Sequence, residues 1–247
     1  MSASSQRSGT RPAHDLAETE RIRREYQRRA REIPADFYSL SRPAVLFGYT
    51  QRIRKTVQAL AKAGCYPPAT LRICDVGCGA GQWLVDFVNW GAEPRRISAI
   101  DLDVQRLGVA RERIPGADLR EGNATCLPWE NDSFDLVLQS TVFTSILDLE
   151  MKRAAATEML RVLKPGGVIL WYDFRYNNPR NPNVRGIEAA EIRSLFPGCR
   201  VDLRRVTLAP PIARRLAPVS WIGALLLEKI PFLRTHYLGI IRKPEGT

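Results

Sequence analysis

Three glycines at alternate positions are the residues in this sequence best suited to bind a ligand. Gly77, Gly79 and Gly81 stand in the stretch DVGCGAG, directly after the apolar residues LRIC. A residue without a Cβ lets the backbone pass close to a bound molecule. A helix predicted from Gln82 onward would add free N–H groups and a positive dipole end. This arrangement favours a ligand with a carboxylate or phosphate, although a tight strand-to-helix turn would also use such glycines.

An acidic residue at a suitable distance strengthens this interpretation. Asp101 follows Gly81 by twenty residues, at the end of the next apolar stretch, where a carboxylate can accept both hydroxyls of a ribose. Asp103 is expected to cap a helix N-terminus. A dinucleotide fingerprint would require a glycine at Gln82. The pattern therefore favours a nucleoside ligand with an anionic or polar tail, rather than a dinucleotide.

Four motifs in order carry a resemblance to a known family. DVGCGAG, AIDLD, EGNATCLPWENDSFDLVL and RVLKPGG lie within about residues 71–172, and together they resemble the class I S-adenosylmethionine-dependent methyltransferases. The resemblance implies a Rossmann-like, doubly wound α/β sheet of about seven strands with its last strand antiparallel. It also implies S-adenosyl-L-methionine as cofactor and S-adenosyl-L-homocysteine as product.

The resemblance assigns cofactor contacts residue by residue. The glycine turn lines the methionine part of the cofactor, the acid after the second strand binds the ribose, and the residue after it packs on the adenine. The assigned residues are Asp75, Gly77, Gly79, Gly81, Asp101, Leu102, Asn123, Ala124 and Gln139. Asn123 departs from the family, which usually has Asp there, but its carbonyl oxygen can still accept from the adenine amino group.

An aromatic segment precedes the first predicted strand. In this family such a segment often folds over the cofactor as a lid, so Tyr38 or Phe47 is expected to close over the methyl group. Arg42 or Arg52 is expected to pair with the cofactor carboxylate. The alternative is that the aromatic residues of 37–50 only pack between helices.

The implied reaction is an in-line displacement at a sulfonium methyl group, which depends mainly on alignment and water exclusion. A hydroxyl acceptor would also benefit from a general base. His236, at the start of the last predicted strand, and Asp173, at the end of the fifth, are the candidate base and its orienting partner. Alternatively, His236 only makes local hydrogen bonds at the sheet edge. No acidic cluster follows the fourth and fifth strands, so no metal is expected.

The elements that must position these residues alternate along the chain. Strands expected near 71–77, 96–103, 117–124, 134–140 and 168–174 alternate with helices, which predicts a parallel sheet with helices on both faces. The strands at 199–208 and 235–243 have no clear packing helix between them and are expected to form an antiparallel edge pair.

The expected organisation has three parts. Residues 1–14 are predicted to be a disordered tail, 15–64 an N-terminal helical extension or lid, and 65–247 the methyltransferase domain. Within that domain, 171–234 contains the expected acceptor-recognition segments. The loop at 171–186 is rich in Asn, Pro and Arg and has two tyrosines, which suits a sugar or another polar acceptor.

Charge and composition limit the classes of partner. The net charge is +11, with 12 basic against 6 acidic residues in 1–60 and 9 against 3 in 200–247. Such ends are compatible with an anionic partner, such as phosphate, nucleic acid or a membrane surface, and equally with a solvated basic protein that has no such partner. No apolar run is long enough for a transmembrane segment. Five cysteines without framework spacing indicate reduced thiols and a cytoplasmic location.

These observations favour one function over two others. The leading hypothesis is S-adenosylmethionine-dependent transfer to a small-molecule or glycan acceptor, with oxygen as the expected acceptor atom. An RNA methyltransferase is the alternative that the charge motivates, but no RNA-binding module is recognisable. A non-catalytic subunit that retains the cofactor fold is the third, and the intact glycine turn argues against it.

Overall fold

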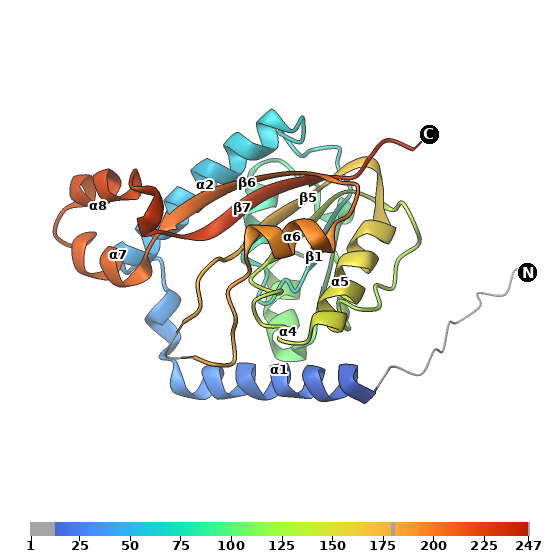
Figure 1. The fold of residues 1–247 in the computed structure, drawn as a ribbon, viewed down its shortest axis with the longest axis horizontal. Helices are drawn as coiled ribbons and strands as arrows, with labels where there is room; N and C mark the ends of the chain where they lie inside the picture. The colour runs from blue at the N-terminus through green and yellow to red at the C-terminus, as the bar shows by residue number, and fades with distance from the viewer. Residues whose placement is uncertain (1–12, 179–180, 247) are drawn as a thin grey trace, which may run out of the picture.

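The computed structural model describes residues 13–178 and 181–246, and it is built on one seven-stranded sheet (Figure 1). The strand order is β3-β2-β1-β4-β5-β7-β6, and β7 runs antiparallel to both of its neighbours. The strands are β1 (Ile73–Val76), β2 (Ile97–Asp101), β3 (Asp118–Glu121), β4 (Phe134–Ser140), β5 (Leu163–Phe174), β6 (Arg200–Leu208) and β7 (Arg234–Arg242). The predicted fold class, including the antiparallel last strand, is confirmed.

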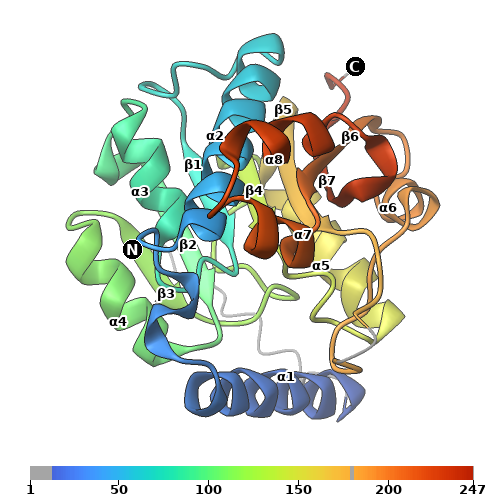
Figure 2. The same cartoon turned by 90° about the vertical axis from the view of Figure 1, so that its left-hand side faces the viewer.

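Helices cover both faces of this sheet, and each face has its own apolar core. On one face lie α2 (Pro43–Lys62), α3 (Gln82–Asn89) and α4 (Val104–Arg113), and on the other lie α5 (Leu149–Val162) and α6 (Ala189–Leu195). The first helix, α1 (Ala13–Glu32), lies apart from α2 and runs along the lower side of the molecule in Figures 1 and 2.

Local sequence signals explain where several of these elements begin and end. All four residues of β1 are buried, as expected for a central parallel strand. The Asp103 carboxylate accepts from the N–H groups of Gln105 and Arg106, so Asp103 caps α4 as predicted. Gly64, with φ +76°, follows the end of α2.

The structure also contains helices that the sequence did not indicate. Between β6 and β7, where no packing helix was expected, the chain forms α7 (Pro210–Leu216) and α8 (Trp221–Glu228). Prolines are tolerated in a first helical turn because its N–H groups have no intrahelical partner, so the prolines of this segment do not prevent a helix. The two helices are anchored by a small third core that includes Phe47 of α2 and Ala224 of α8.

Of the predicted tail, Ala13 and His14 already belong to α1, and residues 1–12 lie outside the described residues. Within 13–178 and 181–246, no helix combines the length and the apolar character that crossing a bilayer requires.

Candidate active site

A cavity of about 550 Å³ lies at the carboxyl ends of the parallel strands. Five of the predicted cofactor residues line it, each just after or at the end of a strand: Gly77, Asp101, Leu102, Asn123 and Ala124. This is the edge at which open parallel sheets bind their ligands. The sheet topology therefore brings together residues that lie up to 47 positions apart in the sequence.

The glycine turn requires its glycines for both conformation and space. Gly77, Gly79 and Gly81 adopt φ values of 78°, 54° and 77°, a region that L side chains rarely enter. A Cβ on Gly77 would collide with the Val142 side chain, and one on Gly79 would collide with the Arg106 guanidinium. The turn therefore requires glycine for its conformation at all three positions, and also for space at Gly77.

Asp101 connects this turn to the following helix. Its Oδ2 accepts from the Gly79 N–H at 2.7 Å, and its Oδ1 accepts from the Asp103 N–H at 2.9 Å. Each carboxylate oxygen can accept a second hydrogen bond. The side chain is therefore fixed in orientation at the cavity wall and retains the capacity to accept ribose hydroxyls.

Asn123 links the cavity wall to α1. Its Nδ2 donates to the Thr19 hydroxyl at 2.8 Å, and its Oδ1 accepts from the Thr125 N–H at 3.1 Å. The Thr19 hydroxyl itself donates to the backbone carbonyl of Asp15, so it needs a donor from its partner. An amide supplies that donor and an ionised carboxylate does not, which explains the departure from the family's usual Asp.

The wall of the cavity that faces away from the sheet is α1. Ile22, Arg23, Tyr26 and Gln27 line the cavity from this helix, and the Tyr26 hydroxyl lies 3.2 Å from the Ser145 Oγ. The sequence analysis included this helix in the predicted extension or lid at 15–64, but it expected the covering residues at 37–50. The available signal was the apolar pair Ile22 and Tyr26, which are four residues apart on an otherwise polar helix.

A second set of polar atoms lies buried without hydrogen-bond partners among the described residues. It comprises both carboxylate oxygens of Asp75, Nε of Arg52 and Nε1 of Trp83. Nε2 of Gln139 also lacks a partner, but Gln139 is opposite Val76 in the β1–β4 register, so its side chain leaves the sheet on the other face from Asp75. The Arg52 guanidinium lies 4.1 Å from the centroid of a Trp83 ring. Burial raises the pKa of the Asp75 carboxyl well above its usual range, as does the nearby Asp101, whereas Arg52 lowers it.

This set fits the amino-acid end of S-adenosylmethionine. A carboxylate with two unpartnered oxygens can accept from an ammonium group, and the unpartnered N–H groups can donate to a carboxylate. Buried polar groups normally have partners, so a zwitterionic ligand would complete what the chain leaves unsatisfied. The predictions for Asp75 and Arg52 are compatible with this geometry, and they stay predictions, as does the prediction for Gln139.

Two other predicted residues are not brought to the cavity. The Tyr38 side chain is 67% exposed. Arg42 pairs with Asp36 at 2.6 Å on the surface. Neither Tyr38 nor Arg42 lines the cavity. Arg52 of α2 forms an ion pair with Asp86 of α3 at 2.7 Å.

The predicted pairing of His236 with Asp173 is wrong. In the β5–β7 register, His236 is opposite Phe174 and Asp173 is opposite Tyr237, so their side chains lie on opposite faces of the sheet. The two strands are antiparallel as expected, but the alternation of side chains separates the pair.

Each of these two residues has its own buried environment. His236 stacks on Tyr172 with a centroid distance of 4.7 Å, and its Nδ1 lies 3.1 Å from the Thr235 hydroxyl. Burial, and secondarily Arg52, lowers the pKa of His236 to about 3. Asp173 accepts from the Thr144 hydroxyl at 2.6 Å, and burial raises the pKa of its carboxyl to about 6. Neither residue lines the cavity, and a catalytic role for either stays a prediction.

Comparisons with known proteins agree with this geometry. Residues 73–167 match a family model described as a methyltransferase domain. A demethylmenaquinone methyltransferase of Renibacterium salmoninarum is 30% identical over 139 residues, which is 56% of this chain and 54% of that protein. Another, of Roseiflexus castenholzii, is 25% identical over 209 residues, 83% of this chain and 84% of that one. The chain spans about half the length of the first curated relatives that it matches.

A third relative and a solved structure extend the comparison. A phthiotriol/phenolphthiotriol dimycocerosates methyltransferase of Mycobacterium ulcerans is 35% identical over 111 residues, 43% of this chain and 39% of that protein. The structure of a putative sarcosine dimethylglycine methyltransferase from Galdieria sulphuraria aligns with a TM-score of 0.59 at 16% identity. That alignment covers 79% of this chain and 86% of the other, and it supports the fold alone.

The seven-stranded sheet and the glycine turn at its ligand edge define a Rossmann-like cofactor-binding domain. With the family match over 73–167, this part of the chain is a methyltransferase domain, of the class I S-adenosylmethionine-dependent type that the four motifs indicated. Among residues 13–178 and 181–246, no group of three or more His, Cys, Asp and Glu side chains is arranged to hold a metal ion.

Proposed function

We propose that this chain transfers the methyl group of S-adenosylmethionine to a small-molecule acceptor. The observation that carries the proposal is the cavity of about 550 Å³ at the ligand edge, which α1 closes on its outer side. Its size lies within the range of small-molecule and cofactor sites. The relatives whose names state a substrate are methyltransferases of demethylmenaquinone and of phthiotriol derivatives, which are small molecules.

The chain's residues would hold the cofactor at both ends. Asp101 would accept from the ribose hydroxyls, Asp75 would accept from the ammonium group, and Arg52 with Trp83 would donate to the carboxylate. When bound, the cofactor supplies a methyl group on a good leaving group, so the protein's task is mainly alignment. Tyr26 and the rest of α1 would exclude water from the cavity.

The titratable groups of the cavity favour an acceptor that needs little help from a base. The lining contains carboxylates and arginines but neither His nor Cys. His236 lies outside the lining and its depressed pKa keeps it neutral, while Asp173 is buried and already hydrogen-bonded. We therefore expect an acceptor atom that is nucleophilic without a strong base, or that carries an acidic proton itself. The expected methylation on oxygen stays a prediction.

The charge of α1 gives little support to the RNA alternative. Phosphate binding requires unpaired cations, but three arginines of α1 pair within the helix. Arg21 contacts Glu18, and both Arg28 and Arg29 contact Glu25, at 2.7 to 3.0 Å. The basic excess of this segment is thus largely engaged in local ion pairs.

The test is an incubation with methyl-labelled S-adenosylmethionine and three acceptor pools: extracted small molecules, glycans and total RNA. We expect label in the small-molecule pool, and loss of that label with Asp101→Asn. Asp118→Asn, a surface carboxylate substitution at the start of β3, is the matched control and should retain labelling. Label confined to RNA, or no labelling by a protein that binds the cofactor, would overturn the proposal.

A further inference from the structure

The segment between β6 and β7 carries an exposed apolar surface. Val219, Ile222, Leu226 and Phe232 are 84%, 72%, 58% and 69% exposed. We refer to these four side chains as the apolar tip. Figure 1 shows α7 and α8 projecting from the body of the molecule, so the apolar tip lies on a protrusion. Large apolar side chains gathered on one exposed segment indicate an interaction surface.

The inner side of the same helices is already packed. Ala213, Ala217 and Ala224 contact Phe47 and Leu208 in a small core, and Trp221 meets the Phe47 ring edge-on at 5.1 Å. The apolar tip is therefore not needed to hold α7 and α8 in place. It faces outward from a segment that has its own anchor.

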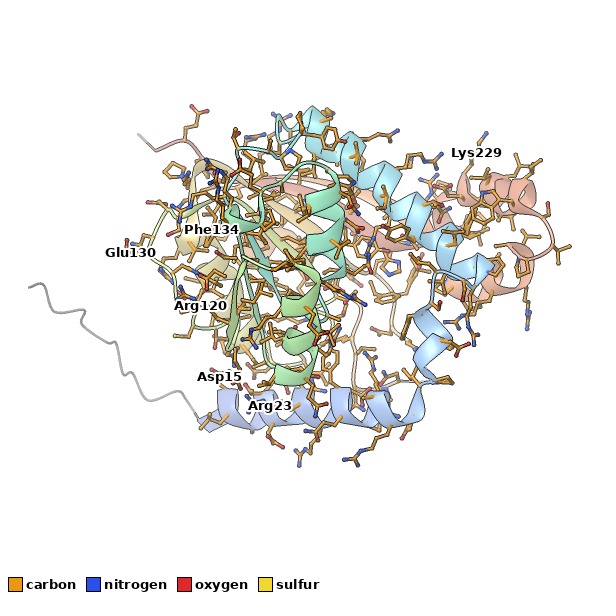
Figure 3. All side chains as sticks on the ribbon, turned by 180° about the vertical axis from the view of Figure 1, so that it is seen from behind. Asp15, Arg23, Arg120, Glu130, Phe134 and Lys229 are labelled. Carbon is orange, nitrogen blue, oxygen red and sulfur yellow. The ribbon has the colours of Figure 1, made fainter. Side chains whose placement is uncertain are left out.

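Positive charge accompanies the apolar tip. Arg214, Arg215 and Lys229 are exposed in this segment, and none has an ion-pair partner among the described residues. The only acidic residue between β6 and β7 is Glu228, which is 6% exposed and pairs with Arg54 at 3.0 Å. Figure 3 shows Lys229 at this protrusion, far from Asp15 and Arg23 on α1.

The exposed apolar side chains and the neighbouring basic ones together favour one kind of binding partner over another. A second copy of the chain would bring the same basic segment to the interface, and that segment has no exposed acidic residue to pair with it, because Glu228 is buried. An anionic lipid surface instead offers phosphates to the basic residues and an acyl boundary to the apolar ones. Charge complementarity therefore favours a membrane over a dimer.

The position of the segment relates it to the cavity. It joins the end of β6 to the start of β7, and β6 runs in the same direction as β5. The protrusion therefore arises from the carboxyl edge of the parallel strands, which is also the edge that holds the cavity.

We propose that the apolar tip inserts into the headgroup region of an anionic bilayer, with Arg214, Arg215 and Lys229 at the level of the lipid phosphates. The protein would bind such a membrane peripherally and reversibly, with its ligand edge turned towards the lipid. This inference goes beyond the proposed function and does not depend on it.

The test is co-sedimentation of the full chain with vesicles of phosphatidylcholine, alone or with 30% phosphatidylglycerol. We expect binding to the anionic vesicles only, and weaker binding at higher salt. The double variant Ile222→Ser, Phe232→Ser should bind at least tenfold more weakly, because two apolar side chains no longer gain burial. The double variant Val109→Ser, Leu149→Ser removes two apolar side chains of similar size that are exposed elsewhere, and it should bind like the parent.

Three outcomes would overturn the inference: no binding by the parent, equal binding by both double variants, or a dimer at micromolar concentration that only the tip variant dissociates. Sedimentation equilibrium measures the last. Circular dichroism establishes that each variant is folded. Calorimetry with S-adenosylmethionine, without vesicles, should give the same affinity for parent and tip variant, so failure of cofactor binding remains distinguishable from failure of membrane binding.

Discussion

At the scale of single residues, the polar groups without partners are the most informative feature of the site. The sequence predicted that Gly77, Asp101, Asn123 and Ala124 would come together at one edge of the sheet, because each follows or ends a strand whose order the motifs fix. It could not predict that Arg52 and Trp83 would lie together near Asp75, since Arg52 comes from α2, upstream of the first strand. Nor could it predict the separation of His236 from Asp173, which depends on a register that no local signal reveals.

Asp75→Asn should weaken cofactor binding and stabilise the ligand-free protein. Burial and Asp101 raise the pKa of the carboxyl above its value in the unfolded protein. The stability that Asp75 contributes is therefore fully present below the pKa of the unfolded protein, and it is lost as the pH rises through the pKa of the folded protein. At pH 7 the neutral amide should therefore raise the free energy of unfolding by roughly 1–3 kcal/mol. Thermal unfolding and calorimetry measure the two effects. A variant that is less stable and binds normally would contradict the assignment.

His236 should make the protein sensitive to acid without shaping its rate profile. Burial lowers its pKa from 6.5 to about 3, so the histidine contributes stability above pH 6.5 that is progressively lost down to about pH 3. Between pH 7 and pH 5 this loss is about 2 kcal/mol at 1.36 kcal/mol per pKa unit. His236→Gln should reduce the loss in urea titrations at the two pH values. An activity inflection near pH 6.5 that disappears in this variant would instead restore the histidine as a base.

At the scale of elements, the sequence predicted the alternating strands and helices but not the placement of two helical segments. The helix near 15–32 was expected as part of an extension or lid. Which of its residues face the cavity was not, because the helix is held by hydrogen bonds to loops more than 100 residues away. The helices α7 and α8 were missed because prolines surround them and their apolar residues show no clear period. In both segments, tertiary packing rather than local pattern determines the structure.

The contact between α1 and Asn123 should control how firmly the helix closes the cavity. Asn123→Asp removes the donor to the Thr19 hydroxyl and leaves a buried carboxylate facing an acceptor. We expect faster amide hydrogen exchange across α1 and roughly tenfold weaker cofactor binding, the cost of about 1.4 kcal/mol in a buried polar contact. Asn89→Asp, at an exposed position in α3, is the control and should change neither. Unchanged exchange across α1 would show that this contact does not hold the helix.

At the scale of the whole molecule, the basic charge is distributed over two regions with different environments. Near the N-terminus it is matched by acids within α1, whereas at the protrusion it stands beside exposed apolar side chains. A net charge of +11 alone could not distinguish these situations, because it carries no information about neighbours.

Turnover of a neutral small-molecule acceptor should depend little on salt. Such an acceptor releases no counterions on binding, whereas RNA affinity falls steeply between 50 and 200 mM salt. In a vesicle-free assay we expect less than a twofold change in kcat/KM over that range. A change of tenfold or more would favour a polyanionic substrate.

The small core beneath α7 and α8 has a consequence for how this enzyme class can diversify. Because that core is separate from the two that stabilise the sheet, the outward residues of the protrusion are free to drift without cost to cofactor binding. Exchange of this segment during evolution would change the membrane that the protein binds and leave its methyl-transfer reaction unchanged. Grafting residues 209–233 onto a relative with the same strand order would recreate that event in the laboratory.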